Sequence, residues 1–240
     1  MAIRVTIWNE FLHEKTDENA KKLYPFGIHA TIRDFLCCDD FEIRLAALED
    51  PDQGLPDEVL SSTDVLIWWG HMRHGDVDDG LVERIRTRVY NGMGFIALHS
   101  AHHSKPFRAI LGTTGNLTWG REQKAIVWNL MPNHPIAAGI PAHFELFEEL
   151  YSEPFFIPTP DELIFGTWYE DGNIFRGGCT YTRGLGKVFY FHPGHETCPS
   201  FHHECVQRII RQAVYFVAPA AKGEGLDNVC VHQTEAPHQG

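Results

Sequence analysis

The stretch Gly94-Phe95-Ile96-Ala97-Leu98-His99-Ser100-Ala101-His102-His103 decides the fold. Its first half is a continuous apolar run, which is typical of a strand that is buried on both faces of a parallel sheet. Two small residues then mark a tight turn among three histidines. In an open α/β sheet, ligands bind at the carboxyl ends of the strands. The stretch therefore predicts a central strand over 94–98 and a functional site that begins at His99.

The composition excludes several classes of function. The 240 residues include 20 basic and 32 acidic ones, so the formal net charge is -12. This charge repels nucleic acid and anionic membranes, and we predict neither as a partner. A neutral or cationic small molecule fits better. No apolar stretch approaches the roughly 20 residues of a membrane span, and the start of the chain leads straight into a strand. We therefore expect a cytoplasmic protein whose six cysteines are mostly free thiols.

The first half of the chain alternates between strands and helices. Buried strands are expected at 3–8, 41–48, 64–69 and 94–98, and helices at 19–24, 28–36, 55–60, 77–90 and 104–111. This alternation predicts a parallel, doubly wound sheet of the flavodoxin-like type.

The second half has a different pattern. An alternating strand is expected at 122–130, and antiparallel strands are expected at 163–169, 174–181 and 187–192. An amphipathic closing helix over 202–217 follows them. We predict a single α/β domain over 1–218. The residues from 219 to 240 are polar and small, and they form either a disordered tail or an arm that docks on a partner subunit. We expect a homo-oligomer.

Histidines gather where strands should end. Three groups follow strands: His71 and His74; His99, His102 and His103; and His192 and His195. If these strands are neighbours, the groups converge, and two kinds of chemistry are open. The first is acid–base catalysis, with Glu149 and Glu196 as orienting carboxylates. The second is a metal site, for which zinc is the most suitable ion.

The other histidines fit structural or surface roles better. This interpretation covers His13, His29, His134, His143, His202, His203, His232 and His238. Among the aromatic residues, Trp68 and Trp69 are expected in the core, whereas Trp119 in a loop is a candidate for stacking on a sugar. The segment 112–115 lacks the lysine of a P-loop, and no G-x-G-x-x-G follows the first strand, so we predict no nucleotide.

Two segments resemble class I glutamine amidotransferases. Residues 97–103 resemble the elbow on which those enzymes present a cysteine, but His99 stands in its place. Phe191-His192-Pro193 resembles their catalytic His-Pro segment, and Gly194 stands where their glutamate would be. The resemblance implies an amidotransferase-like fold without glutaminase activity.

A closer resemblance is to the ThuA-like family of trehalose-utilisation proteins, over nearly the whole chain. The matching pieces are Trp68-Trp69-Gly70-His71, 94–99, His134-Pro135, Gly139-Ile140-Pro141, Glu149-Leu150-Tyr151, 186–190 and Pro193-Gly194-His195. The resemblance implies a role in the catabolism of trehalose or a related disaccharide. It also implies a functional partner, a dehydrogenase that makes 3-keto sugars.

We therefore predict an enzyme that isomerises, epimerises or eliminates a disaccharide or its 3-keto derivative. The predicted catalytic residues are His99, His192 and Glu149, and the predicted substrate-binding residues are His102, His103, Trp119 and Tyr151. A divalent metal would be held by His71, His99, His192 and His195. The alternatives are a metal-assisted hydrolase and a non-catalytic sugar-binding or regulatory protein.

Overall fold

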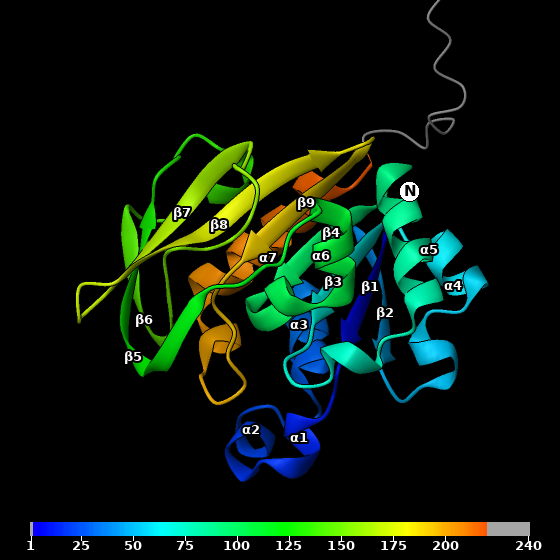
Figure 1. Ribbon diagram of the computed structural model, residues 1–240, viewed down its shortest axis with the longest axis horizontal. Coiled ribbons are helices and arrows are strands. Elements are labelled where there is room, and N and C mark those ends of the chain that lie inside the picture. The colour runs from blue at the N-terminus through cyan, green and yellow to red at the C-terminus, as the bar shows by residue number, and fades with distance from the viewer. Residues whose placement is uncertain (1, 220–240) are drawn as a thin grey trace, which may run out of the picture.

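One nine-stranded sheet runs through the protein (Figure 1), as seen in a computed structural model that describes residues 2–219. Five strands form its parallel half, in the order β2 (Phe41–Ala47), β1 (Ile3–Asn9), β3 (Val65–Trp69), β4 (Gly94–Leu98) and β9 (Gly186–Phe191). Four antiparallel strands continue it: β8 (Ile174–Arg183), β7 (Glu162–Tyr169), β5 (Thr118–Asn129) and β6 (His143–Ser152). The predicted α/β fold is confirmed.

The parallel half has the flavodoxin-like strand order, with β9 in the fifth position. The prediction for this last strand needs a correction, because β9 is not simply antiparallel. It pairs parallel with β4 and antiparallel with β8, so it joins the two halves of the sheet. The turn between β8 and β9 makes their antiparallel pairing visible in the sequence. The pairing of β9 with β4 joins residues far apart in the chain, so no local pattern predicts it.

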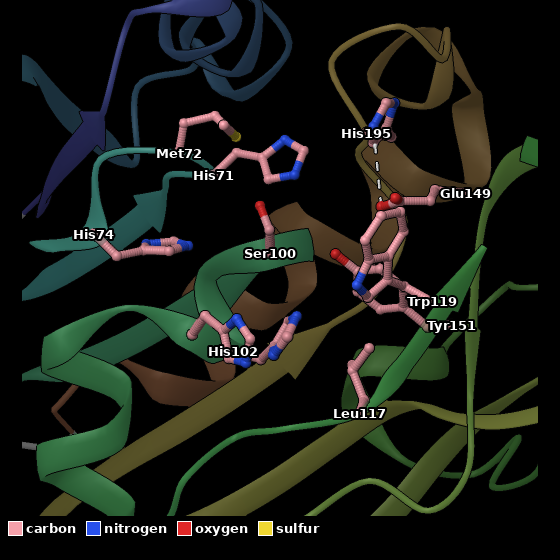
Figure 2. Close-up of a pocket in the computed structure, with 11 residues that line it drawn as sticks. His71, Met72, His74, Ser100, His102, Leu117, Trp119, Glu149, Tyr151 and His195 are labelled. Carbon is pink, nitrogen blue, oxygen red and sulfur yellow. Dashed lines mark ion pairs between the residues drawn. The ribbon is translucent and has the colours of Figure 1, made fainter. Parts of the chain in front are cut away.

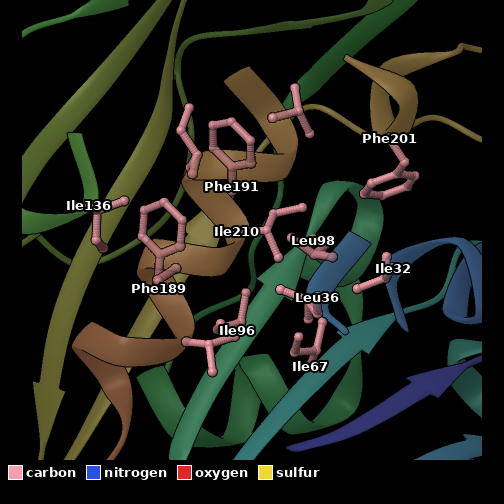
Figure 3. Close-up of a cluster of buried hydrophobic side chains, with 14 of the residues drawn as sticks. Ile32, Leu36, Ile67, Ile96, Leu98, Ile136, Phe189, Phe191, Phe201 and Ile210 are labelled. Carbon is pink, nitrogen blue, oxygen red and sulfur yellow. The ribbon is translucent and has the colours of Figure 1, made fainter. Parts of the chain in front are cut away.

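Helices cover both faces of the parallel half. On one face, α3 (Ile28–Leu36) and α7 (Glu204–Val217) pack on alternate strand residues such as Ile67, Ile96 and Phe189 (Figure 3). On the other face lie α4 (Asp57–Ser62), α5 (Asp79–Tyr90) and α6 (Lys105–Leu111). Two further helices, α1 (His13–Thr16) and α2 (Glu18–Leu23), follow β1. This double cover explains why the central strands are apolar at every position.

The tryptophan pair at the end of β3 shows the two faces directly. Trp68 stacks on Trp8 with ring centroids 3.7 Å apart, in the core beneath α4 and α5. Trp69 points to the opposite face and donates a hydrogen bond from Nε1 to the carbonyl of Gly194, 2.9 Å away. Both side chains are fully buried, which confirms their predicted place in the core.

Single 3-10 turns complete the described elements, at Pro51–Gly54, His74–Asp76, His99–His103, Pro135–Ala137 and Ser200–His202. All five cysteines within residues 2–219 are unpaired. No helix of this part of the chain is long and apolar enough to cross a membrane. The predicted tail lies, from residue 220 onward, outside the described residues.

Candidate functional site

The polar residues of the site come from four strand ends of the parallel half and from β6. Glu10 follows β1, His71 follows β3, His99 follows β4 and His195 follows β9. The strands β1 and β3 flank the point where the strand order reverses, which is where doubly wound folds bind ligands. The antiparallel half brings β6 to the same place, where the ring of Tyr151 stacks on His99 with centroids 5.0 Å apart.

His99 occupies a strained elbow between β4 and α6. Its φ angle is 51°, in the left-handed region that a residue with a side chain seldom adopts. The next residue ties the turn to β3, because Ser100 Oγ donates to the carbonyl of Gly70 at 2.7 Å. Ser104 then caps α6 by accepting from the N–H of Phe107. The strained backbone places the His99 imidazole at the floor of the site.

The two nitrogens of His99 have different partners. Nδ1 lies 3.0 Å from the carbonyl oxygen of His192 and donates to it, which directs Nε2 toward the site. Nε2 lies 3.1 Å from Glu149 Oε2 and 3.3 Å from the hydroxyl of Tyr151. Burial alone would lower the pKa of His99, but the nearby carboxylates, first that of Glu149, outweigh burial and raise it to about 8.

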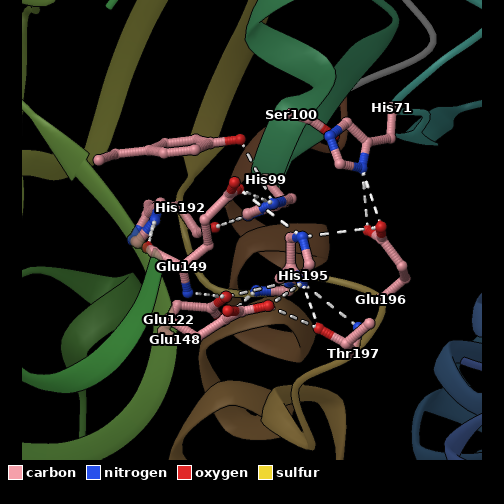
Figure 4. Close-up of polar contacts among 12 residues, drawn as sticks. His71, His99, Ser100, Glu122, Glu148, Glu149, His192, His195, Glu196 and Thr197 are labelled. Atoms are coloured by element: carbon pink, nitrogen blue, oxygen red, sulfur yellow. Dashed lines mark hydrogen bonds and ion pairs between the residues drawn. The ribbon is translucent and has the colours of Figure 1, made fainter. Parts of the chain in front are cut away.

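We call His99, Glu149 and His195 the inner group. One ligand atom of each lies within 4.8 Å of the others, and all three side chains are buried (Figure 4). Oε2 of Glu149 is buried, and its contact with Nε2 of His99 at 3.1 Å is an imidazole–carboxylate pair. Nδ1 of His195 lies 2.8 Å from the hydroxyl of Thr197, which donates in turn to Glu122 at 3.0 Å. The second ring nitrogen of His195 is left to face Glu149 and Glu196, at 3.9 and 3.6 Å.

We call His13, His71 and Glu196 the outer group. Here too, one ligand atom of each residue lies within 4.8 Å of the others. Nδ1 of His71 lies 3.0 Å from Glu196 Oε2, and Nε2 of His13 lies 3.4 Å from Glu196 Oε1. Burial raises the pKa of Glu196, but His71 and the other imidazoles more than offset this effect and lower it to about 2. Glu196 is therefore a carboxylate surrounded by imidazoles.

Both groups fit a divalent metal ion. Two histidines and one glutamate form a known ligand set of catalytic zinc, which leaves the fourth position open. Zinc bonds of about 2.0–2.1 Å in a tetrahedron place neighbouring ligand atoms about 3.3 Å apart. The contacts of 3.1 Å from His99 to Glu149 and of 3.0 and 3.4 Å from His71 and His13 to Glu196 are close to this spacing.

Two further buried carboxylates fix the loops that carry these ligands. Glu10 accepts the backbone N–H groups of residues 71, 72 and 73, at 2.8, 3.0 and 2.8 Å. Glu148 accepts those of residues 149, 194 and 195, at 2.9, 2.7 and 3.1 Å, and the hydroxyl of Ser200 at 2.6 Å. Each carboxylate is 1% exposed, and its charge is stabilised by these donors.

A cavity of about 470 Å³ opens above the inner group (Figure 2). It is lined by His71, Met72, His74, Ser100, His102, His103, Leu117, Trp119, Glu149, Tyr151 and His195. All four predicted substrate-binding residues are among them. Trp119 and Met72 are 70% and 65% exposed, which leaves apolar surface available to a ligand.

His102 has one ring nitrogen that is open to the cavity. Its Nδ1 donates to the carbonyl of Gly115 at 2.6 Å, whereas no hydrogen bond to Nε2 occurs among residues 2–219. Burial lowers the pKa of His102 well below the usual value, and the neighbouring His103 lowers it further. The ring is therefore neutral, and its free Nε2 can accept a proton or a hydrogen bond.

His192 lies beneath the site and not in it. Its Nε2 donates to the carbonyl of Glu149 at 3.1 Å and lies 3.2 Å from the hydroxyl of Tyr169. The ring is fully buried and belongs to neither ligand group. The structure thus brings together His71, His99 and His195 of the predicted metal ligands, and it assigns His192 to holding the backbone of β6.

Sequence reasoning missed three residues of the site. His13 was interpreted as structural, and neither Glu10 nor Glu148 was singled out. One signal was available, because Glu10 and His13 directly follow β1, a strand that also ends at this edge of the sheet. Glu148 is adjacent to Glu149 in a strand, where alternation places the two side chains on opposite faces.

The fold and the site together define an amidotransferase-like α/β protein that has a histidine at its elbow. The residues from 4 to 217 match the family described as ThuA, trehalose utilisation. The chain belongs to this family. No curated protein matches it.

Solved structures show the same fold at low sequence identity. A putative ThuA-like protein from Parabacteroides merdae has a TM-score of 0.68 and 13% identity, with 93% of each chain covered. A cytoplasmic protein from Salmonella typhimurium has a TM-score of 0.60 and 11% identity, and the match covers 90% of this chain and 100% of the other. A glutamine amidotransferase from Thermotoga maritima has a TM-score of 0.57 and 10% identity, and the match covers 90% of this chain and 98% of the other. These likenesses confirm the predicted fold, and the family match over residues 4–217 confirms the predicted family.

Proposed function

We propose that this protein is an enzyme of disaccharide utilisation that transfers protons on trehalose or its 3-keto derivative, with a divalent metal ion in the inner group. The observation that carries the proposal is the position of His99, Glu149 and His195 beneath a cavity of about 470 Å³. This volume lies in the range of small-molecule sites, roughly 300–1,000 Å³. The trehalose-utilisation family supports the class of substrate.

The inner group fits the metal because its buried Glu149 Oε2 faces two imidazole nitrogens, Nε2 of His99 at 3.1 Å and Nε2 of His195 at 3.9 Å. The hydrogen bond from His99 Nδ1 to a backbone carbonyl is the kind of second contact that orients a ligating imidazole. A bound divalent cation would polarise a sugar carbonyl and make the adjacent carbon acidic. Zinc is the ion that two imidazoles and one carboxylate suit best.

The residues of the cavity wall bind the sugar and move the proton. His102 is the general base, since its ring is neutral and its Nε2 is free. Trp119 offers an exposed indole on which an apolar sugar face can stack. Tyr151 is paired with Trp119 across β5 and β6, and its hydroxyl stands beside His99 to bind a sugar oxygen.

Glutaminase chemistry does not suit this site. His99 replaces the cysteine at the elbow, and position 194 cannot hold the glutamate. A Cβ at Gly194 would lie 2.5 Å from Cζ of Phe201, so any side chain there would displace the ring. We further propose that the substrate comes from a dehydrogenase that oxidises the sugar, and that both proteins act in the cytoplasm.

The test is to incubate the purified, zinc-loaded protein with trehalose and with 3-keto-trehalose in D₂O. With 3-keto-trehalose we expect deuterium on the carbon beside the carbonyl and a changed keto sugar by NMR, whereas trehalose, which has no carbonyl group, should not exchange. Glu149→Gln and His102→Asn should abolish or strongly slow this exchange, whereas the exposed control His143→Asn should not. Release of free glucose would identify a hydrolase instead. Saturable sugar binding without any turnover would identify a binding protein.

A further inference from the structure

We infer that the outer group, His13, His71 and Glu196, binds a second divalent cation beside the one proposed for the inner group. The inference rests on the metal-assisted part of the proposed function. It adds a separate ion with ligands of its own, which makes the centre binuclear.

The first argument is the ligand set. Like the inner group, the outer group contains two imidazoles and one carboxylate, and each ligand comes from a different segment. His13 is the first residue of α1, His71 follows β3, and Glu196 follows β9. The loop of His71 is fixed by Glu10, and the backbone of the β9 loop is fixed by Glu148 at residues 194 and 195. The positions of two of the three ligands are thus set independently of one another.

The second argument is that the carboxylate of Glu196 has only imidazoles as polar partners among residues 2–219. Glu196 is 4% exposed, and no lysine or arginine in residues 2–219 pairs with it or with Glu149. Nδ1 of His13 is buried without a hydrogen-bond partner in residues 2–219, and the polar contact of this ring is that of Nε2 with Glu196. A buried carboxylate requires a compensating positive charge, and among residues 2–219 no lysine or arginine side chain supplies one to Glu196. A cation would provide it.

The third argument is the distance between the groups. Nε2 of His195 lies 3.9 Å from Glu149 Oε2 and 3.6 Å from Glu196 Oε1, so the two carboxylates converge on one ring. The ring centroids of His71 and His195 are 5.6 Å apart. The ligand atoms of the two groups therefore adjoin at His195, as the ligands of a two-metal site must.

A pair of cations selects a particular kind of ligand. One ion holds a single carbonyl oxygen, whereas two adjacent ions hold two oxygens on neighbouring carbons. An α-hydroxyketone offers this arrangement, and a 3-keto sugar contains one. The binuclear centre therefore favours the keto derivative over the parent disaccharide, which has no carbonyl group.

The experiment measures metal stoichiometry on the full-length chain. The protein is stripped with a chelator, reloaded with ZnCl₂ and separated from weakly held zinc by a mild competing chelator, and zinc per chain is then determined by mass spectrometry. We expect two ions in the wild type and one in each of Glu196→Gln and Glu149→Gln. The control Glu162→Gln removes the charge of a carboxylate that lies 3.1 Å from His134, outside both ligand groups, and this variant should keep two zinc ions. Circular dichroism checks that each variant is folded.

A second measurement does not depend on counting. Loading with Mn²⁺ should give a spin-coupled electron paramagnetic resonance signal in the wild type and in Glu162→Gln. In Glu196→Gln and His13→Gln this signal should become that of isolated Mn²⁺.

Each other outcome decides the matter. One zinc ion in the wild type and in Glu196→Gln, with none in Glu149→Gln, would overturn the second site and leave the proposed function intact. One ion that is lost in Glu196→Gln and kept in Glu149→Gln would overturn the binuclear centre and also remove the metal from the proposed function. No zinc in any protein would overturn both.

Discussion

His99 combines a strained backbone with an imidazole that is held between a carbonyl and a carboxylate. Without a metal, its raised pKa of about 8 favours an imidazolium paired with Glu149 at neutral pH. A metal ligand must be a neutral imidazole, so metal binding at this residue releases a proton. Metal affinity should therefore fall as the pH falls.

The exposed indole of Trp119 allows a direct test of sugar binding. Trp119→Ala should weaken disaccharide or keto-sugar affinity roughly five- to tenfold, because a stacking contact contributes about 1 kcal/mol. Stability and zinc content should stay unchanged, since the side chain is 70% exposed. Isothermal titration calorimetry measures the affinity. The control is Trp168→Ala on β7, outside the cavity, and equal loss in both variants would contradict a role for Trp119.

His29 predicts an acid-sensitive stability. Burial lowers its pKa to about 4, although Asp50 acts in the opposite direction, and its Nδ1 lies 3.0 Å from Asn9 Nδ2. The folded pKa lies below the unfolded value of about 6.5, so the unfolded state binds more protons between these values. The free energy of unfolding should fall by about 3 kcal/mol because of this group as the pH falls from 6.5 to 4. The loss should be complete just below pH 4.

The substitution His29→Asn keeps an acceptor for Asn9 and removes the titration. In urea unfolding at pH 7, 5.5 and 4, its stability should fall less steeply with pH than that of the wild type. The exposed control His143→Asn should follow the wild type. Equal slopes for all three proteins would exclude His29 as the cause.

At the scale of elements, buried carboxylates hold the loops that follow β3 and β9. Glu10→Gln replaces a carboxylate that accepts three N–H groups by an amide with one acceptor oxygen and an unwanted donor. We expect a loss of about 2–4 kcal/mol in unfolding free energy, because buried charged hydrogen bonds are strong. Chemical denaturation measures it. The exposed control Glu58→Gln on α4 should change stability by less than about 0.5 kcal/mol.

The loop after β9 depends on Gly194, whose φ angle is 139°. Gly194→Ala should destabilise the protein by about 3 kcal/mol, because the strain of this backbone adds to a clash with Phe201. It should also lower zinc retention by displacing His195. Gly172→Ala is the matched control, since it has a φ of 91° and open space around its Cβ, and it should cost only about 1 kcal/mol. Similar losses for both would show that packing at Phe201 is unimportant.

At the scale of the whole molecule, the site joins elements from both halves of the sheet, so a bound metal should stabilise the entire fold. With free zinc at about 1,000 times its dissociation constant, the gain is about 4 kcal/mol, or a rise in Tm of about 10 °C. Stripping with a chelator should remove this gain at pH 7.5, and zinc should restore it. At pH 5.5 the gain should shrink, because protons compete for the imidazoles. Differential scanning calorimetry measures both effects.

The double variant Glu149→Gln/Glu196→Gln is the control for this measurement, and its Tm should not respond to the chelator. A wild-type Tm that is equally insensitive would contradict metal binding. Self-association remains a prediction, because the tail that suggested it lies outside the described residues.

The sequence by itself determined the α/β class, the central strands and the histidines that follow them. Continuous apolar runs are a local signal in the sequence. The polar residue that follows such a run lies at the carboxyl end of the strand, where the site is. Tertiary structure alone decided how β9 pairs, how β6 reaches the site, and that His13 joins it while His192 lies beneath it. These features depend on contacts between residues far apart in the chain, and the orientation of a side chain at such a contact is set by packing that no local pattern records.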